Sequence, residues 1–229
     1  MYYMDPTYLI LIPGIILALV AQGMVKSAFN KYSRVPSRSG LTGARLARIL
    51  LDKQGLNDIP VQRVAGNLTD NYNPSDRTLN LSQSVYDSSS VAALGVAAHE
   101  CGHAMQHQEG YAPLAMRSAI VPVTQIGSNL SWPLFLIGLI ASFRPLLVAG
   151  IVLFCFTVLF TLITLPVEFN ASRRAIRVLE GDMILEGEEF AGARSVLRAA
   201  ALTYVASALS AILNLLRLVA LSGRGRRRN

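Results

Sequence analysis

The 229-residue sequence is poor in the residues that ordinary soluble domains use for their surfaces and framework. Only 15% of its residues are charged and 7% are aromatic, whereas 52% are hydrophobic. This balance, with a mean hydropathy of +0.41, argues against a soluble domain and is typical of a membrane protein with a modest polar part. The two cysteines lie far apart in unrelated contexts, which argues against a disulfide framework.

Basic residues outnumber acidic ones, and the net charge is +7. Most of these residues are arginines that flank apolar blocks, including a basic tail at Arg224 to Arg228. Such flanks favour contact with anionic lipid headgroups. A nucleic-acid-binding protein would instead carry a separate basic domain with aromatic platforms, so we expect the lipid bilayer, and no nucleic acid, as a partner.

Long uncharged blocks predict about four transmembrane helices. The first block, Tyr8 to Val25, is long enough to cross a hydrocarbon core of ~30 Å. Val121 to Ser142 and Pro145 to Leu165 predict a tight membrane hairpin, because Phe143, Arg144 and Pro145 form the only break between them. Ala199 to Leu216 is either a fourth span or a helix packed at the membrane surface, and we favour the span.

The polar region between the first two blocks contains local helix and strand signals. Gly43 to Leu56 has helical spacing, whereas Ile59 to Val64 and Thr78 to Leu81 are short and β-prone. The run Asn71 to Asp76 predicts a turn between these strands. Serine residues just before Val91 then predict the start of a helix that runs to His107.

All three histidines of the protein lie in one stretch of that helix, VAAHECGHAMQH, from Val96 to His107. His99 and His103 are four residues apart, about 6 Å along one helix face, where both imidazoles can ligate one zinc ion. Glu100 lies beside them, in a position that suits a general base for zinc-bound water. This H-E-x-x-H pattern is the zincin signature. Its alternative, two helix histidines with an incidental glutamate, would leave costly polar groups among small apolar residues.

A catalytic zinc usually has three protein ligands, so one more is needed. His107 lies ~12 Å along the helix from His99, too far to share the ion. Among the downstream acids, we expect Glu168 to be the third ligand, because the chain returns there to the side of the motif after the membrane hairpin. The alternative for Glu168 is a headgroup-level charge paired with an arginine.

Three segments resemble the YugP-like zinc membrane peptidases, and the likeness covers nearly the whole chain. They are LTDNYNPSDRTLNLSQSVYDSSSVAALGVAAHECGHAMQ, PVEFNASRRA and AGARSVLRAAALTYVASAL. The chain is more distantly similar to the HtpX and CAAX prenyl protease group, in which H-E-x-G-H precedes E-x-x-A-D. The resemblance implies that His99 and His103 are zinc ligands, that Glu100 is the base and that Glu168 is the third ligand.

The chain departs from the distant group at Ser172, where that group has aspartate. A carboxylate that would orient a histidine is therefore missing there, and we expect Asn170 or another group to substitute. For the oxyanion of the tetrahedral intermediate, the candidates are Arg173, Arg174 and Tyr204. The resemblance also implies that an extended substrate adds to a sheet edge near Thr78 to Leu81.

These features predict a mainly α-helical integral membrane protein that carries a small α+β, zincin-like protease domain of the gluzincin type. The expected parts are an N-terminal anchor at 1–25, the zincin-like domain at 26–120 and a transmembrane hairpin at 121–166. Next comes a helix region at 167–195 that holds the expected third ligand. The last part, at 196–229, is a C-terminal membrane or membrane-associated helix with the basic tail.

The predicted function is that of a zinc-dependent membrane endopeptidase with one Zn²⁺ per chain and a membrane-associated polypeptide substrate. The alternative is a catalytically silent zinc-binding adaptor or quality-control protein. A transporter is disfavoured, because the spans hold few ionisable groups. Basic residues that follow the first span and the hairpin place the active site in the cytoplasm, and we expect a bacterial cell membrane. The oligomeric state is left open.

Overall fold

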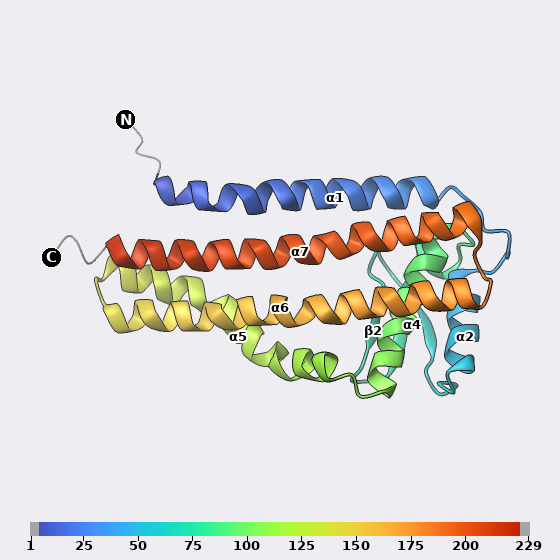
Figure 1. The fold of residues 1–229 in the computed structure, drawn as a ribbon. Coiled ribbons are helices and arrows are strands. Elements are labelled where there is room, and N and C mark those ends of the chain that lie inside the picture. The colour runs from blue at the N-terminus through green and yellow to red at the C-terminus, as the bar shows by residue number, and fades with distance from the viewer. Residues whose placement is uncertain (1–4, 225–229) are drawn as a thin grey trace. The chain divides into compact units, whose positions relative to one another are not determined.

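The computed structural model describes residues 5–224 and is mainly helical. Figure 1 shows the helices and strands in chain order. A short 3₁₀ helix at Pro6–Leu11 leads into α1 (Ile12–Tyr32), and α2 follows at Gly43–Lys53. Three strands come next, β1 (Val61–Val64), β2 (Asn71–Asn73) and β3 (Thr78–Ser82). The remaining helices are α3 (Gln83–Tyr86), α4 (Val91–Gln108), α5 (Ala112–Ile140), α6 (Arg144–Gly181) and α7 (Gly187–Arg224).

Four helical segments are long and apolar enough to cross a membrane: Pro6–Tyr32, Ala112–Ile140, Arg144–Gly181 and Gly187–Gly223. They coincide with the four predicted apolar blocks. A short break between the two hairpin spans is confirmed, but it lies at residues 141–143, since α5 ends at Ile140 and the predicted break residues Arg144 and Pro145 already belong to α6. Of the predicted basic tail, Arg224 closes α7, and the other residues lie outside the described part of the chain.

The chain divides into two compact units. The first unit holds the residues up to Ala21, then Ala115–Pro166 and the residues from Thr203 onward. Its core contains Phe135 from α5 with Phe154 and Val158 from α6. Parts of all four candidate spans belong to this unit, which fits a bundle surrounded by lipid.

The second unit comprises Gln22–Leu114 and Val167–Leu202 and has a continuous apolar core. Helix α2 begins at the Thr42 cap and places Leu46, Leu50 and Leu51 in that core, at the spacing expected for one helix face. Helix α2 packs against α4, and α4 also contacts β2 and β3. The sheet and the motif helix are therefore parts of the same packed body.

The sheet differs from the prediction in its order. Strand β3 lies in the centre, parallel to β1 and antiparallel to β2, with Leu79 opposite both Val61 and Tyr72. The prediction of a free substrate edge at Thr78 to Leu81 is wrong, because β3 is paired on both sides. The run expected to form only a turn supplies β2 in its first three residues, and the outer strands are β1 and β2.

Helix α6 also differs from the expected division of the chain at position 166. It continues as one helix from Arg144 to Gly181, with Pro166 inside it. Proline is tolerated within long membrane helices, because neighbouring groups satisfy the freed carbonyls. The residues after Pro166 are therefore held in direct helical continuation of the second hairpin span.

Candidate metal centre

Helix α4 carries the histidines and begins where the sequence predicts. The Ser90 hydroxyl caps it by accepting a hydrogen bond from the Ala93 amide at 3.3 Å. Nearly every residue from Val91 to Gln106 is buried. A helix so enclosed offers no water to its polar side chains, so each of them needs a partner within the protein.

His99 and His103 lie on one face of α4, as their spacing predicts. Their ring centroids are 4.8 Å apart and the rings are nearly perpendicular, at 85°. His103 is 8% exposed, and His99 is partly buried. Both rings turn an Nε2 atom toward the same point, which is occupied by a carboxylate from another helix.

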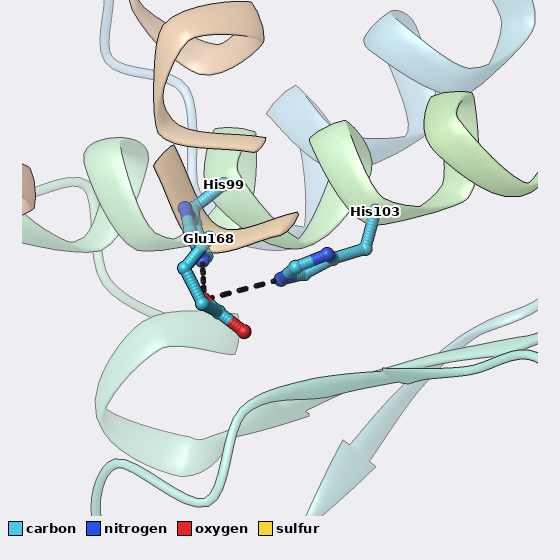
Figure 2. A group of neighbouring side chains, drawn as sticks. All are labelled: His99, His103 and Glu168. Carbon is cyan, nitrogen blue, oxygen red and sulfur yellow. Dashed lines mark hydrogen bonds and ion pairs between the residues drawn. The ribbon is translucent and has the colours of Figure 1, made fainter. Parts of the chain in front are cut away.

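That carboxylate belongs to Glu168 of α6, and Figure 2 shows it between the two rings. Its Oε2 lies 3.2 Å from Nε2 of His99 and 3.6 Å from Nε2 of His103. Ligand atoms around a tetrahedral zinc with bonds of about 2.0–2.1 Å are about 3.3 Å apart. Two imidazoles and a carboxylate also form a donor set that catalytic zinc uses. The three side chains therefore fit one zinc ion.

Glu100 follows His99 directly and is also buried, with 8% of its surface exposed. Its Oε2 accepts a hydrogen bond from the Tyr72 amide of β2 at 3.0 Å, whereas Oε1 makes no hydrogen bond within the described residues. Burial raises the pKa of Glu100; the two neighbouring histidines oppose this, and the carboxylates of Glu168 and Asp70 add to it. A buried carboxylate with a raised pKa and one uncommitted oxygen is suited to accept and release a proton.

His103 is subject to opposing electrostatic effects. Burial lowers its pKa, but the hydrogen bond to Glu168 and the negative charges of Glu100 and Glu168 outweigh this effect and raise it. The excess of negative charge around the two imidazoles is the condition that favours a cation between them.

The outward-facing nitrogen of each ring has its own partner. Nδ1 of His99 lies 3.2 Å from the Ser172 hydroxyl, so the serine at the departure from the distant group contacts a predicted ligand itself. Nδ1 of His103 lies 3.0 Å from Oε1 of Gln106. Asn170, the predicted substitute, contacts Gln106 at 3.0 Å rather than a histidine. Sequence reasoning missed Gln106, although its position three residues after His103 places it on the same helix face.

Within the described residues, Arg173 and His107 make no hydrogen bond or ion pair with the three candidate ligands. Arg173 is exposed and lies about 140° around α6 from Glu168, without a hydrogen bond or ion pair within residues 5–224. Tyr204 belongs to the other compact unit, so its role stays a prediction. His107 is exposed at the end of α4, where Nδ1 lies 2.8 Å from the Tyr72 hydroxyl.

Arg174, the third candidate for oxyanion stabilisation, is engaged elsewhere. Its guanidinium binds both oxygens of Glu109, at 2.6 and 2.7 Å, and its Nε donates to Asn170 at 2.7 Å. The Arg174 side chain is thus committed to links between the end of α4 and α6. Cys101 follows Glu100 in the sequence and is buried on the side of α4 opposite the two histidines. Burial raises the pKa of its thiol.

Comparison of the sequence with known proteins identifies the family of the chain. A family model described as "Putative neutral zinc metallopeptidase" matches residues 7–223. The chain is 48% identical over 213 residues to the "Putative membrane protease YugP" of Bacillus subtilis (strain 168), across 93% of this chain and 95% of that protein. No solved structure matches the chain. Since the family model covers almost the whole chain, this membrane protein belongs to the family that the model describes as "Putative neutral zinc metallopeptidase".

Proposed function

We propose that the chain is a zinc-dependent endopeptidase that hydrolyses polypeptides at the membrane, with one zinc ion held by His99, His103 and Glu168. The observation that carries the proposal is the position of Glu100. It lies beside the three candidate ligands on the same buried helix, with one oxygen fixed by an amide and the other uncommitted. A metal site with a structural role alone needs no such carboxylate.

The bound zinc ion would supply a Lewis acid that acidifies water and polarises the scissile carbonyl. In this proposal Oε1 of Glu100 takes the proton of the attacking water and passes it to the leaving nitrogen. The Tyr72 amide holds Oε2 throughout and prevents the carboxylate from swinging into the metal position. His99, His103 and Glu168 keep their ligand atoms within 4.8 Å of one another.

Two further proposals concern the oxyanion and the location of the site. We propose Arg173 or Tyr204 as the oxyanion stabiliser, so substitution of the responsible residue by methionine or phenylalanine would lower kcat without lowering zinc content. We also propose a bacterial cell membrane as the location, with the active site facing the cytoplasm. The support is the set of basic residues after the first span and after the hairpin.

The decisive experiment compares the purified wild-type protein with the variants Glu100→Gln and Glu180→Gln. Zinc content and cleavage of a labelled unfolded polypeptide are measured on the same samples. Glu100→Gln keeps one zinc per chain and loses about 10²–10⁴-fold in kcat, the usual contribution of a general base. Glu180 is exposed on α6, so its variant serves as the matched control and keeps both properties.

Two results would contradict the proposal. Cleavage by Glu100→Gln at the wild-type rate would remove Glu100 as the base. The other result is a wild-type protein that binds zinc but cleaves no polypeptide, together with a Glu100→Gln variant that changes only the zinc content. That result would favour a catalytically silent zinc-binding protein.

A further inference from the structure

Gln106 is a fully buried polar residue that links the two halves of the candidate metal centre. It lies on α4, with 0% of its surface exposed, and its side-chain hydrogen bonds within the described residues go to His103, Val167 and Asn170. We infer that Gln106 is a positioning residue, which fixes the proton of His103 on Nδ1 and so turns the lone pair of Nε2 toward the metal. This role rests on the proposed zinc site and adds a residue to it that the H-E-x-x-H motif does not include.

The first step is the orientation of the Gln106 amide. Its Nε2 lies 2.8 Å from the main-chain oxygen of Val167, which can only accept a hydrogen bond. The same Nε2 lies 3.0 Å from Oδ1 of Asn170. If the amide were turned over, its oxygen would face these two oxygens, and both hydrogen bonds would become repulsive contacts.

The second step excludes a concerted reversal of both amides. Oδ1 of Asn170 also lies 2.7 Å from Nε of Arg174, and an arginine N–H can only donate. The Asn170 oxygen must therefore face Arg174, where it also receives the Nε2 hydrogen of Gln106. One obligatory acceptor and one obligatory donor thus determine the orientation of both amides.

The third step follows at His103. With Nε2 of Gln106 turned to α6, its Oε1 faces Nδ1 of His103 at 3.0 Å and can only accept. The histidine must donate from Nδ1, and the neutral ring then has its lone pair on Nε2. That atom is the one that lies 3.6 Å from Glu168, in the candidate metal centre.

The hydrogen-bond partner of His99 does not determine which ring nitrogen carries the proton. Nδ1 of His99 lies beside the Ser172 hydroxyl, which can donate or accept and therefore permits either ring proton position. The two histidines thus differ: the surroundings of His103 select one tautomer, and the contact of His99 with Ser172 does not. Gln108→Leu, which makes the same change at an exposed glutamine of α4, is the matched control for Gln106→Leu.

The test measures zinc affinity of the full-length protein in detergent by competition with a chelator. Gln106→Leu keeps the side-chain size but removes the acceptor, and we expect zinc affinity to fall 10–100-fold, the usual effect of losing such a partner. Gln106→Glu keeps an oxygen for His103, while its second oxygen, protonated in this buried position, can donate to only one of the two acceptors on α6. Affinity within a few-fold of wild type, or tighter, is expected for this variant.

The pair of variants separates positioning from a structural role. If the hydrogen bonds to Val167 and Asn170 were what mattered, Gln106→Glu would lose zinc affinity as Gln106→Leu does, and that result would overturn the inference. So would an unchanged affinity in Gln106→Leu while the wild-type protein binds zinc. A wild-type protein that binds no zinc would overturn the proposed function and this role together.

A spectroscopic readout needs no variant that could fail to fold. The protein has three histidines, so nitrogen-15 labelling of histidine gives three rings to assign. In the zinc-loaded wild-type protein the His103 ring is expected to bind zinc through Nε2 and to carry a hydrogen-bonded proton on Nδ1. Ser172→Ala should shift the Nδ1 signal of His99 and leave that of His103 in place. Coordination of zinc by Nδ1 of His103 would overturn the assignment.

Discussion

Gly102 of α4 lies directly against the main-chain carbonyl of Ala171 in α6, so closely that a β-carbon on Gly102 would be 2.7 Å from that oxygen. Gly102 directly precedes His103, and Ala171 follows Glu168 by three residues on α6. A glycine at this position allows the backbones to approach, and the approach brings the carboxylate of α6 to the histidines of α4.

Gly102→Ala is therefore expected to separate the two helices locally. We expect a loss of about 1–3 kcal/mol of stability, the usual cost of overpacking, and a lower zinc affinity, because Glu168 moves away from the two rings. Melting temperature and chelator competition in detergent measure both effects. Gly181→Ala is the control, since a β-carbon there meets nothing within 4 Å. Equal behaviour of the two variants would show that the close approach is unimportant.

Removal of the third ligand tests the metal centre directly. Glu168→Ala leaves two histidines, and zinc affinity is expected to fall by more than about 100-fold, since even an outer partner of a ligand is worth 10–100-fold. Metal analysis after dialysis against a weak chelator measures the change. Glu180→Ala, on the exposed side of the same helix, keeps its zinc. Full zinc retention in Glu168→Ala would assign the third ligand to another residue.

The core of the metal centre was predictable because its information is local or topological. His99, Glu100 and His103 occupy one helix, where a spacing of four residues determines which side chains share a face. Glu168 was predictable from the membrane hairpin, because two spans return the chain to the side from which it left. Its contact with both histidines, at 3.2 and 3.6 Å, is the geometric outcome of that topology.

The strand order of the sheet and the hydrogen-bond partners of the candidate ligands could not be predicted, because a local sequence pattern contains no information about distant contacts. Strand β1 pairs directly and in parallel with β3, although β2 lies between them in the sequence. Local spacing could therefore not identify β3 as the central strand. The side chain of Gln106 is oriented by Val167 and Asn170, more than sixty residues away, and these contacts exist only after α4 and α6 have packed. Its place three residues after His103 puts Gln106 on the same helix face, but glutamine has no spacing rule comparable with that of the histidines, so the motif alone did not single it out.

The pair of Glu109 and Arg174 predicts a small pH dependence of stability. The hydrogen bond from Arg174 lowers the pKa of Glu109, so the folded-state pKa lies below the unfolded-state value. The stabilisation is therefore present above the unfolded-state pKa and is lost as the pH falls through the lower folded-state pKa. Since the Glu109 side chain is 55% exposed, solvent screening limits the effect to well under about 1 kcal/mol.

Melting temperatures of the wild type and of Glu109→Gln, recorded between neutral and acidic pH, measure this contribution. The wild type is expected to be slightly more stable at neutral pH, and the difference should vanish as the pH falls below the lowered pKa of Glu109. Glu180→Gln provides the baseline for removing an exposed glutamate. A difference that grows as the pH falls would contradict the assigned sign.

The cytoplasmic orientation of the metal centre can be tested with a single reporter cysteine. Asn57 is exposed in the turn between α2 and β1, in the same compact unit as the metal centre. In an Asn57→Cys, Cys155→Ser protein the remaining native cysteine, Cys101, is buried, and burial raises the pKa of its thiol, so the reporter provides the reactive group.

With the active site in the cytoplasm, a membrane-impermeant maleimide should leave this protein unlabelled in intact bacterial cells and label it after permeabilisation. The Cys155→Ser protein without the reporter measures background labelling. Equal labelling before and after permeabilisation would place the second unit outside the cell and reverse the orientation inferred from the basic residues. Because α4, the sheet and the residues after Pro166 belong to that unit, one reporter then fixes the side for all three proposed zinc ligands.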